Sequence, residues 1–216
     1  MAFERYLYYI LLVIAVVLAY INSKNDKRLV IICWLLFFSI MTESASDYFR
    51  SFAETKRYTP YHFYIPIEYC LVTFYLSGLL QISWLKKLLK ISILFFIIFS
   101  VIISIYLQEI NEFPSWQYNI EGTLIIIWCV ISLFNLPLNP DMNIFKTFQF
   151  WFCIAFMVMF SGQFFMNGFF NSLKNTNPEL IKKLIFIVYY VLNYLFYTLI
   201  IFGLLCSRPT RKYISQ

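Results

Sequence analysis

Hydrophobic residues form seven long stretches along the chain, and short polar segments separate them. Each stretch provides most of the ~20 apolar residues that a helix needs to cross a bilayer. Backbone polar groups find no partner in lipid, so each stretch is predicted to be helical. The stretches are Arg5–Ile21, Leu29–Phe49, Phe63–Ile82, Leu88–Leu107, Ile120–Leu138, Gln149–Phe170 and Leu184–Cys206. The pattern predicts an all-α membrane protein, a single domain over residues 1–216 built as a bundle of seven transmembrane helices.

Local signals support the limits of three stretches. Pro137 closes the fifth. Asn177, Pro178 and Glu179 before the seventh are typical of an N-cap, a first-turn proline and a first-turn acid, so this helix should begin before its lysines. Residues 1–21 lack the basic flank and small-residue cleavage site of a signal peptide, which favours a retained first span.

Composition indicates lipid as the solvent of the folded chain. Hydrophobic residues make up 61% of the sequence and charged residues only 13%, more apolar surface than a water-soluble domain of this size buries. The net charge of +6 comes from Lys and Arg at the ends of the stretches, where they indicate topology and not nucleic-acid binding. Their distribution predicts an outside N-terminus and a cytoplasmic C-terminus. We expect a multi-pass protein of a bacterial inner membrane, with the lipid bilayer as its first partner.

No recognised motif predicts a cofactor, a metal site or an enzymatic reaction. The five cysteines lie inside apolar stretches without CxxC spacing, and His62 is the only histidine, which excludes a multi-histidine metal centre. A retinal protein would need a lysine within the last span, and there is none after Lys183. Arg57 and His62 have the spacing of a helical ribonuclease motif, but Pro60 between them argues against that helix.

Acidic residues stand out near the end of the second stretch and the start of the third. Glu43 and Asp47 are four residues apart and share a helix face, with Ser39 and Ser51 on the same stripe. Counting from the predicted helix ends places Glu43 ~9 Å and Glu68 ~8 Å below the surface. We therefore predict that the two carboxyls share one level in an acidic pocket open to the extracytoplasmic side.

The later stretches add polar residues toward the same side. Gln163 and Asn167 are four apart near the end of the sixth stretch, and Asn193 lies in the seventh on a stripe with three tyrosines. Glu121 opens the fifth stretch. A structural interpretation of these residues stays open. The three amides would then form hydrogen bonds that hold helices together. Asp47 would pair with Arg50 among the headgroups, and Glu121 would be a first-turn acid favoured by the helix dipole.

The run from Tyr61 to Tyr69, Tyr-His-Phe-Tyr-Ile-Pro-Ile-Glu-Tyr, resembles a group of bacterial seven-span membrane proteins. These carry a Y-H-x-Y-x-x-I-E-like run at the start of the third span and an acid late in the second, which Glu43 matches. The resemblance implies the seven-span fold and a unit of Glu43, His62 and Glu68, with Tyr64 in the same run, but it implies no activity. Pro66 departs from the pattern and favours a kink.

Three functional hypotheses follow. The first is a sensor or transporter that binds a small ligand or cation through Glu43, Asp47, His62, Tyr64, Glu68, Gln163, Asn167 and Asn193. The second is a membrane effector or accessory subunit that acts with a protein partner or as a homo-oligomer. It follows from a likeness in size and composition to small membrane proteins encoded beside antiviral systems. The third, an intramembrane enzyme using acids and His62, lacks a nucleophile or metal in recognisable spacing.

Overall fold

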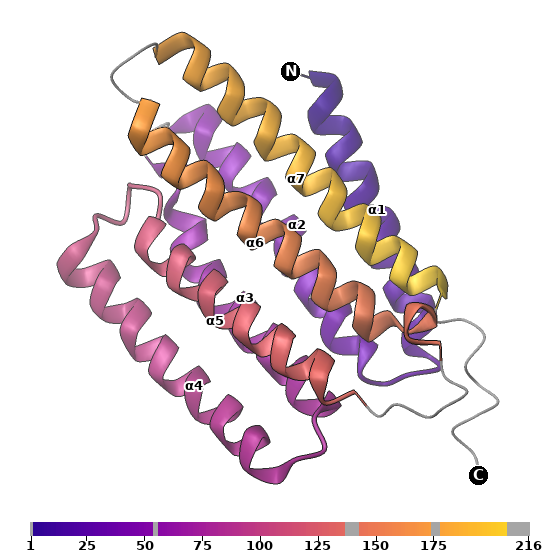
Figure 1. Cartoon of the computed structure of the whole chain (residues 1–216). Coiled ribbons are helices and arrows are strands. Elements are labelled where there is room, and N and C mark those ends of the chain that lie inside the picture. Colours follow the sequence, from indigo (N-terminus) through magenta and orange to yellow (C-terminus); the bar gives the residue numbers. More distant parts are fainter. Residues whose placement is uncertain (1, 54–55, 137–142, 174–177, 207–216) are drawn as a thin grey trace. The chain divides into compact units, whose positions relative to one another are not determined.

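The computed structural model describes residues 2–53, 56–136, 143–173 and 178–206. It describes the side chains of these residues except those of 2–3, 167–173, 178–185 and 187. Within these ranges the chain is helical, without a β-strand (Figure 1). The α-helices are α1 (Ala2–Ser23), α2 (Leu29–Phe52), α3 (Thr59–Leu79), α4 (Ser83–Ile102), α5 (Ser115–Phe134), α6 (Phe148–Leu173) and α7 (Pro178–Cys206). A π-helical turn, η2 (Ile103–Leu107), extends α4, and a 3-10 turn, η3 (Ile144–Lys146), precedes α6.

Each predicted hydrophobic stretch coincides with one α-helix, so the all-helical prediction is confirmed. Helix α7 begins at Pro178, before its lysines, as its end signals predict. Pro137 and Asn177 lie outside the described residues. Among those described, six helices are long and apolar enough to cross a membrane, and α3 is not one of them. Helix α3 carries His62, Pro66 and Glu68, which lower its hydropathy.

Contacts group the chain into two compact units. The first unit contains residues 1–18 and 138–216, and the second contains residues 19–137. The first therefore holds most of α1 together with α6 and α7, and the second holds α2 to α5. Each unit has its own packing.

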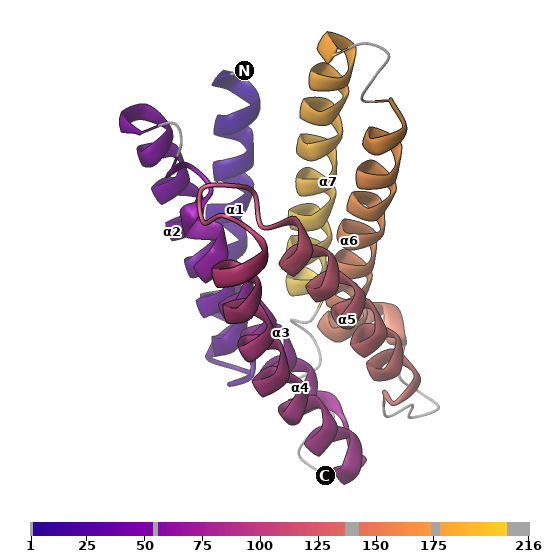
Figure 2. The same cartoon turned by 90° about the vertical axis from the view of Figure 1, so that its left-hand side faces the viewer.

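In the second unit, α3 is the central helix. It contacts α2, α4 and α5, which lie around it (Figures 1 and 2). Its buried side chains, including Ile65, Tyr69, Val72 and Leu76, are spaced three or four apart and form its apolar faces. A helix covered by three neighbours presents less surface to lipid, which explains why α3 tolerates more polar residues than the other helices do.

Helices α2 and α3 run antiparallel, and their contacts fix the register between them. Ser39 contacts Tyr64, Glu43 interacts with Tyr61, and the Ser46 hydroxyl donates a hydrogen bond of 2.9 Å to the carbonyl oxygen of Arg57. Helix α2 thus extends about two turns beyond the level at which α3 begins. Glu43 lies level with Tyr61, and Glu68 lies seven residues further along α3, roughly 10 Å at 1.5 Å per residue.

The prediction that Glu43 and Glu68 share one level is therefore wrong. It assumed that α2 ends and α3 begins at the same height. The six-residue connection between them (residues 53–58) is long enough for the two ends to be offset.

The connection between α1 and α2 is stabilised by Asp26 and Arg28. The Arg28 guanidinium donates hydrogen bonds to both Asp26 carboxylate oxygens, the shorter being 2.8 Å. Partial burial favours the neutral acid, but the Arg28 side chain and backbone N–H outweigh it and lower the pKa of Asp26. The contact is thus present at neutral pH and is lost as the pH falls through this lowered pKa.

In the first unit, α6 and α7 lie side by side along their length (Figures 1 and 2). Phe152, Phe156 and Phe196 fill the interface with aromatic rings, and glycines allow close approach at Gly162 and Gly203. Helix α1 joins this pair through tyrosines of α7. The Tyr8 and Tyr197 hydroxyls are 3.4 Å apart, and the Tyr194 hydroxyl donates to the carbonyl oxygen of Glu4 at 2.7 Å.

Candidate functional site

Two carboxyl groups interact electrostatically in the second unit, half-buried Glu68 of α3 and fully buried Glu121 of α5. Glu121 is 0% exposed, and neither of its carboxyl oxygens has a hydrogen-bond partner among the described residues. Its carboxyl interacts electrostatically with that of Glu68, which is hydrogen-bonded to Tyr64. Among the described residues, the two acids have no Lys or Arg on their own helices and no ion pair.

The first-turn interpretation of Glu121 does not hold. Helix α5 begins at Ser115, five residues earlier than predicted, so Glu121 is in its second turn. Gln117 and Glu121 are one turn apart and face α3 and α4 together with Ile125 and Trp128, all of them buried. The helix dipole acts mainly on the first turn and therefore does not explain this acid.

His62 begins a chain of hydrogen bonds on the side of α3 that faces η2 and α5. Its Nε2 is 2.9 Å from the Glu112 carbonyl oxygen, which only accepts, so Nε2 carries the proton and donates. In the neutral ring Nδ1 then accepts from the Ser104 hydroxyl at 3.1 Å. The Ser104 oxygen in turn accepts from Nε2 of Gln117 at 2.6 Å. The chain connects the loop after η2 with α3, α4 and α5.

This network fixes the orientation of the Gln117 amide. Gln117 is 0% exposed, and its Nε2 also donates to the Ser100 carbonyl oxygen at 2.9 Å. Both donor positions are therefore used, while Oε1 lies buried without a hydrogen-bond partner in the described residues. The Ser100 hydroxyl is in the same situation. Polar atoms without partners in the described residues thus lie at Gln117, one turn before Glu121, and at Ser100 of α4, where apolar packing would otherwise be expected.

We expect replacement of His62 by Ala to loosen the loop between η2 and α5. The change leaves the Glu112 carbonyl without its donor and Ser104 without its acceptor, which should cost ~1–3 kcal/mol of unfolding free energy. Hydrogen exchange followed by mass spectrometry should show faster exchange in residues 108–117.

Glu112→Ala is the matched control, because it removes an exposed side chain and keeps the carbonyl that His62 contacts. Equal exchange in the two variants would show that His62 does not hold the loop.

A second polar contact lies deeper, where Tyr69 bridges α4 and α5. The Tyr69 hydroxyl is 2.8 Å from the Ser92 hydroxyl and accepts from Nε1 of Trp128 at 3.2 Å. Tyr69 also interacts electrostatically with Glu121. Trp128 therefore lies two contacts from the carboxyl pair.

Among the residues predicted from sequence, Glu43 and Asp47 form a separate group near the start of α3. Both are half-buried and both interact with Tyr61. His62 and Tyr64 point to different neighbours, His62 to Ser104 and Tyr64 to Ser39 of α2 at 2.6 Å. Arg57 contacts the ring of Tyr58 and hydrogen-bonds its hydroxyl, so Arg57 and His62 have different neighbours. The predicted unit of Glu43, His62 and Glu68 is therefore distributed over three places around α3.

The predicted amides belong to the first unit. Nδ2 of Asn193 donates to the Tyr189 carbonyl at 2.8 Å, and Nε2 of Gln163 is 3.6 Å from Sδ of Met159. Both bonds stay within one helix, so the described contacts do not show these amides linking helices. The side chain of Asn167 lies outside the described residues.

Sequence reasoning missed Ser92, Ser100, Ser104 and Gln117. The serines are spaced in multiples of four along one face of the otherwise apolar α4 and η2, and Gln117 is four residues before Glu121. The same four-residue spacing singled out Glu43 with Asp47, so the signal was available. It was overlooked because serine is a weak marker of a polar face and because Gln117 was placed outside the fifth helix.

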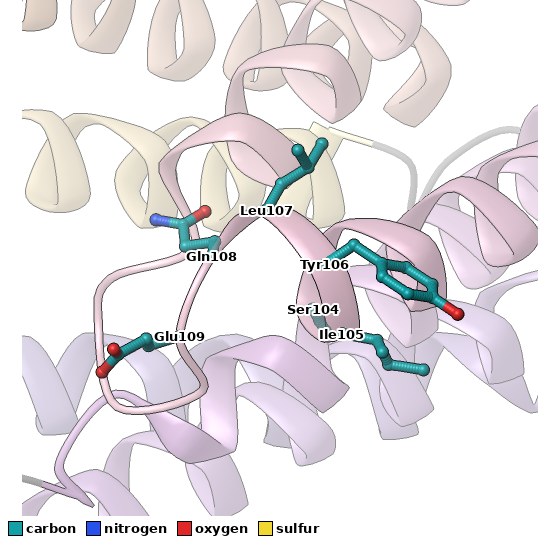
Figure 3. Close-up of a pocket in the computed structure, with 6 residues that line it drawn as sticks. All are labelled: Ser104, Ile105, Tyr106, Leu107, Gln108 and Glu109. Atoms are coloured by element: carbon teal, nitrogen blue, oxygen red, sulfur yellow. The ribbon is translucent and has the colours of Figure 1, made fainter.

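The surface beside this network is hollowed only slightly. A depression of about 210 Å³ is lined by residues of η2 and the loop after it. Figure 3 shows the Tyr106 and Glu109 side chains pointing away from each other, so they do not converge on a ligand. Among the described residues, no group of His, Cys, Asp or Glu is arranged to hold a metal ion. The pair of fully buried Glu121 and half-buried Glu68 is therefore the stronger candidate site.

The chain matches no protein-family model, no curated protein and no solved structure. The resemblance of residues 61–69 to a bacterial seven-span group stays a prediction.

Proposed function

We propose that the protein binds and releases protons at the Glu68–Glu121 pair inside a membrane bundle, as a proton-linked transporter or sensor. The observation that supports this most is the Glu121 carboxyl, fully buried and without a hydrogen-bond partner in the described residues. An ionised carboxylate within a bilayer costs several kcal/mol. Two adjacent carboxylates without a cation are costlier still, so the pair holds at least one proton at neutral pH.

The proton fits this site better than a divalent metal. Cys70 also acts on Glu121, but among the described residues no group of three or more acids, cysteines or histidines is arranged to hold a metal ion. A proton needs only an oxygen atom to bind and a neighbouring negative charge that favours its binding. The second carboxyl supplies that charge. Proton relays in membrane transporters are built from intramembrane carboxyls of this kind.

Infrared spectroscopy of the protein in liposomes tests the proposal. The wild type should show a protonated-carboxyl band at neutral pH that disappears only on strong alkalinisation, and E68Q/E121Q should lack this band. Glu109→Gln is the matched control, because Glu109 is an exposed carboxyl and its loss should leave the band unchanged. Absence of the band in the wild type, or its persistence in the double variant, would refute proton storage at this pair.

We also propose that α3 spans the membrane with the other six helices, and that the N-terminus is outside. The antiparallel contacts between α2 and α3 support this, because a helix packed along a spanning neighbour crosses with it. Single cysteines introduced at Lys27 and Glu112, in a variant lacking the five native cysteines, should label from opposite sides of the membrane. Labelling from one side would contradict the seven-span topology.

A further inference from the structure

The carboxyl pair continues toward α2 through a series of hydroxyl groups. Tyr64 of α3 is hydrogen-bonded to Glu68, and its hydroxyl lies 2.6 Å from the Ser39 hydroxyl of α2. Ser39 is 8% exposed, so this contact is enclosed between the two helices. A chain of oxygen atoms thus leads from the pair to the face of α2 that carries the acids.

On α2, polar side chains follow one another on this face at intervals of one helical turn toward the C-terminal end of the helix. Ser39, Glu43 and Asp47 are successive positions four apart, which places their side chains one above the other. Tyr61 of α3 interacts with Glu43 and Asp47 and lies beside them. The acids predicted as one pocket are instead arranged at successive levels, from Asp47 near the start of α3 inward to Glu68.

The hydrogen bonds along this chain allow transfer toward Glu68. The Ser39 hydroxyl has two acceptors within reach, the Leu35 carbonyl oxygen at 3.0 Å and the Tyr64 oxygen at 2.6 Å. When Ser39 donates to Tyr64, the single hydroxyl proton of Tyr64 is directed to the Glu68 carboxylate.

The opposite side of α3 is a poor route for protons. The hydrogen bonds from His62 through Ser104 end at Gln117, whose amide nitrogen is committed to two acceptors. An amide does not ionise in the physiological range, whereas carboxyls and hydroxyls pass protons on readily. The two sides of α3 thus differ in chemistry, although both are polar.

We propose that protons reach the Glu68–Glu121 pair from the α2–α3 side, along Asp47, Glu43, Ser39 and Tyr64. The inference rests on the proposed function. In one inward transfer, Glu43 gives its proton to the Ser39 oxygen, Ser39 gives its own to the Tyr64 oxygen, and Tyr64 gives its own to the Glu68 carboxylate. Each O–H bond broken is matched by one formed, Glu43 becomes ionised and Glu68 neutral. Asp47 then reprotonates Glu43 from the aqueous side.

Few other titratable groups face this route. Helix α3 contributes Tyr61, Tyr69 and Cys70, and α5 contributes Glu121. From α4, serines contact Tyr69 and Gln117, and Lys90 of that helix is exposed. His62 lies one level outward and contacts Ser104.

A matched pair of Ser→Ala variants tests the route. After transfer of the liposomes to D₂O, the protonated-carboxyl band shifts as the proton exchanges for deuterium, and the rate of this shift is the readout. Ser39→Ala and Glu43→Gln should each slow the shift by about tenfold or more, while the pH at which the band disappears stays unchanged. Ser104→Ala, which interrupts the His62 side, should exchange at the wild-type rate. Ser39→Thr keeps a hydroxyl and should restore it.

The outcomes separate this proposal from the proposed function. Absence of the protonated-carboxyl band in the wild type would contradict the proposed function itself. A band whose exchange is slowed by Ser104→Ala and not by Ser39→Ala overturns the route and leaves the function in place. Equal exchange in all variants would show that protons enter through general opening of the bundle, and it also overturns the route. Circular dichroism of Ser39→Ala confirms that a slowed exchange occurs in a folded protein.

Discussion

Replacing Glu121 with methionine should make the protein more stable. The two carboxyl oxygens of Glu121 are buried without hydrogen-bond partners in the described residues, and an unsatisfied buried polar group costs ~1–3 kcal/mol. Methionine has a similar length and adapts to irregular space, so it should fill the site without strain. Thermal unfolding in detergent should show a higher midpoint for Glu121→Met.

Gln117→Leu is the control for this prediction. Gln117 lies one turn away and is equally buried, but it donates two hydrogen bonds, and their loss should lower the unfolding midpoint. An acid that is kept for function is expected to lower the stability of the fold, because functional sites often cost stability. A lower midpoint for Glu121→Met would show that Glu121 serves the packing and not the chemistry.

Gly203→Ala should lower stability by forcing α6 and α7 apart, and more than the same change at Gly78 or Gly162. A Cβ at Gly203 would lie 2.7 Å from Cβ of Trp151 and 3.1 Å from the ring of Phe148. The Cβ of Trp151 is fixed to its backbone, so the two helices must move apart. Overpacking of this kind costs typically ~1–3 kcal/mol. The readout is the unfolding midpoint in detergent.

Two other glycines calibrate this result. At Gly78 the nearest atom to an added Cβ is Cδ of Arg28 at 3.7 Å, an ordinary contact, so Gly78→Ala should be neutral or slightly stabilising. At Gly162 the neighbour is the end of the Leu192 side chain, which can rotate, so an intermediate effect is expected. If Gly203→Ala behaves like Gly78→Ala, the close approach of α6 and α7 is not required for stability.

The helices themselves are predictable from sequence because their signal is local. An apolar run of sufficient length indicates a helix whatever its neighbours are, and Pro178 with Glu179 marks the start of α7 from adjacent residues alone. The end points are less certain: α3 begins four residues before the predicted start and α5 five residues before it. The polar residues at the starts of α3 and α5 are helical, but a hydropathy pattern predicts a loop for them.

The site depends on relations between helices, which the pattern does not contain. That Glu68 faces Glu121 follows from the rotation of α3 and α5 about their axes and from their relative height, and both are set by side-chain packing. The offset between α2 and α3 likewise depends on a connection whose length does not fix the levels of the helix ends. Sequence therefore identified Glu43, Asp47 and Glu68 as unusual residues but grouped them with the wrong neighbours.

The π-helical turn at the end of α4 has a consequence for this network. The Gln108 N–H donates to the Ile103 carbonyl oxygen, five residues back, so the turn contains one residue more than an α-helix would need. Deleting one residue of η2 would restore α-helical winding and would shorten the segment that carries Ser104 and leads to Glu112, the two partners of His62. The hydrogen bonds of His62 to η2 and to the loop after it therefore depend on a turn that is one residue wider than an α-helical turn.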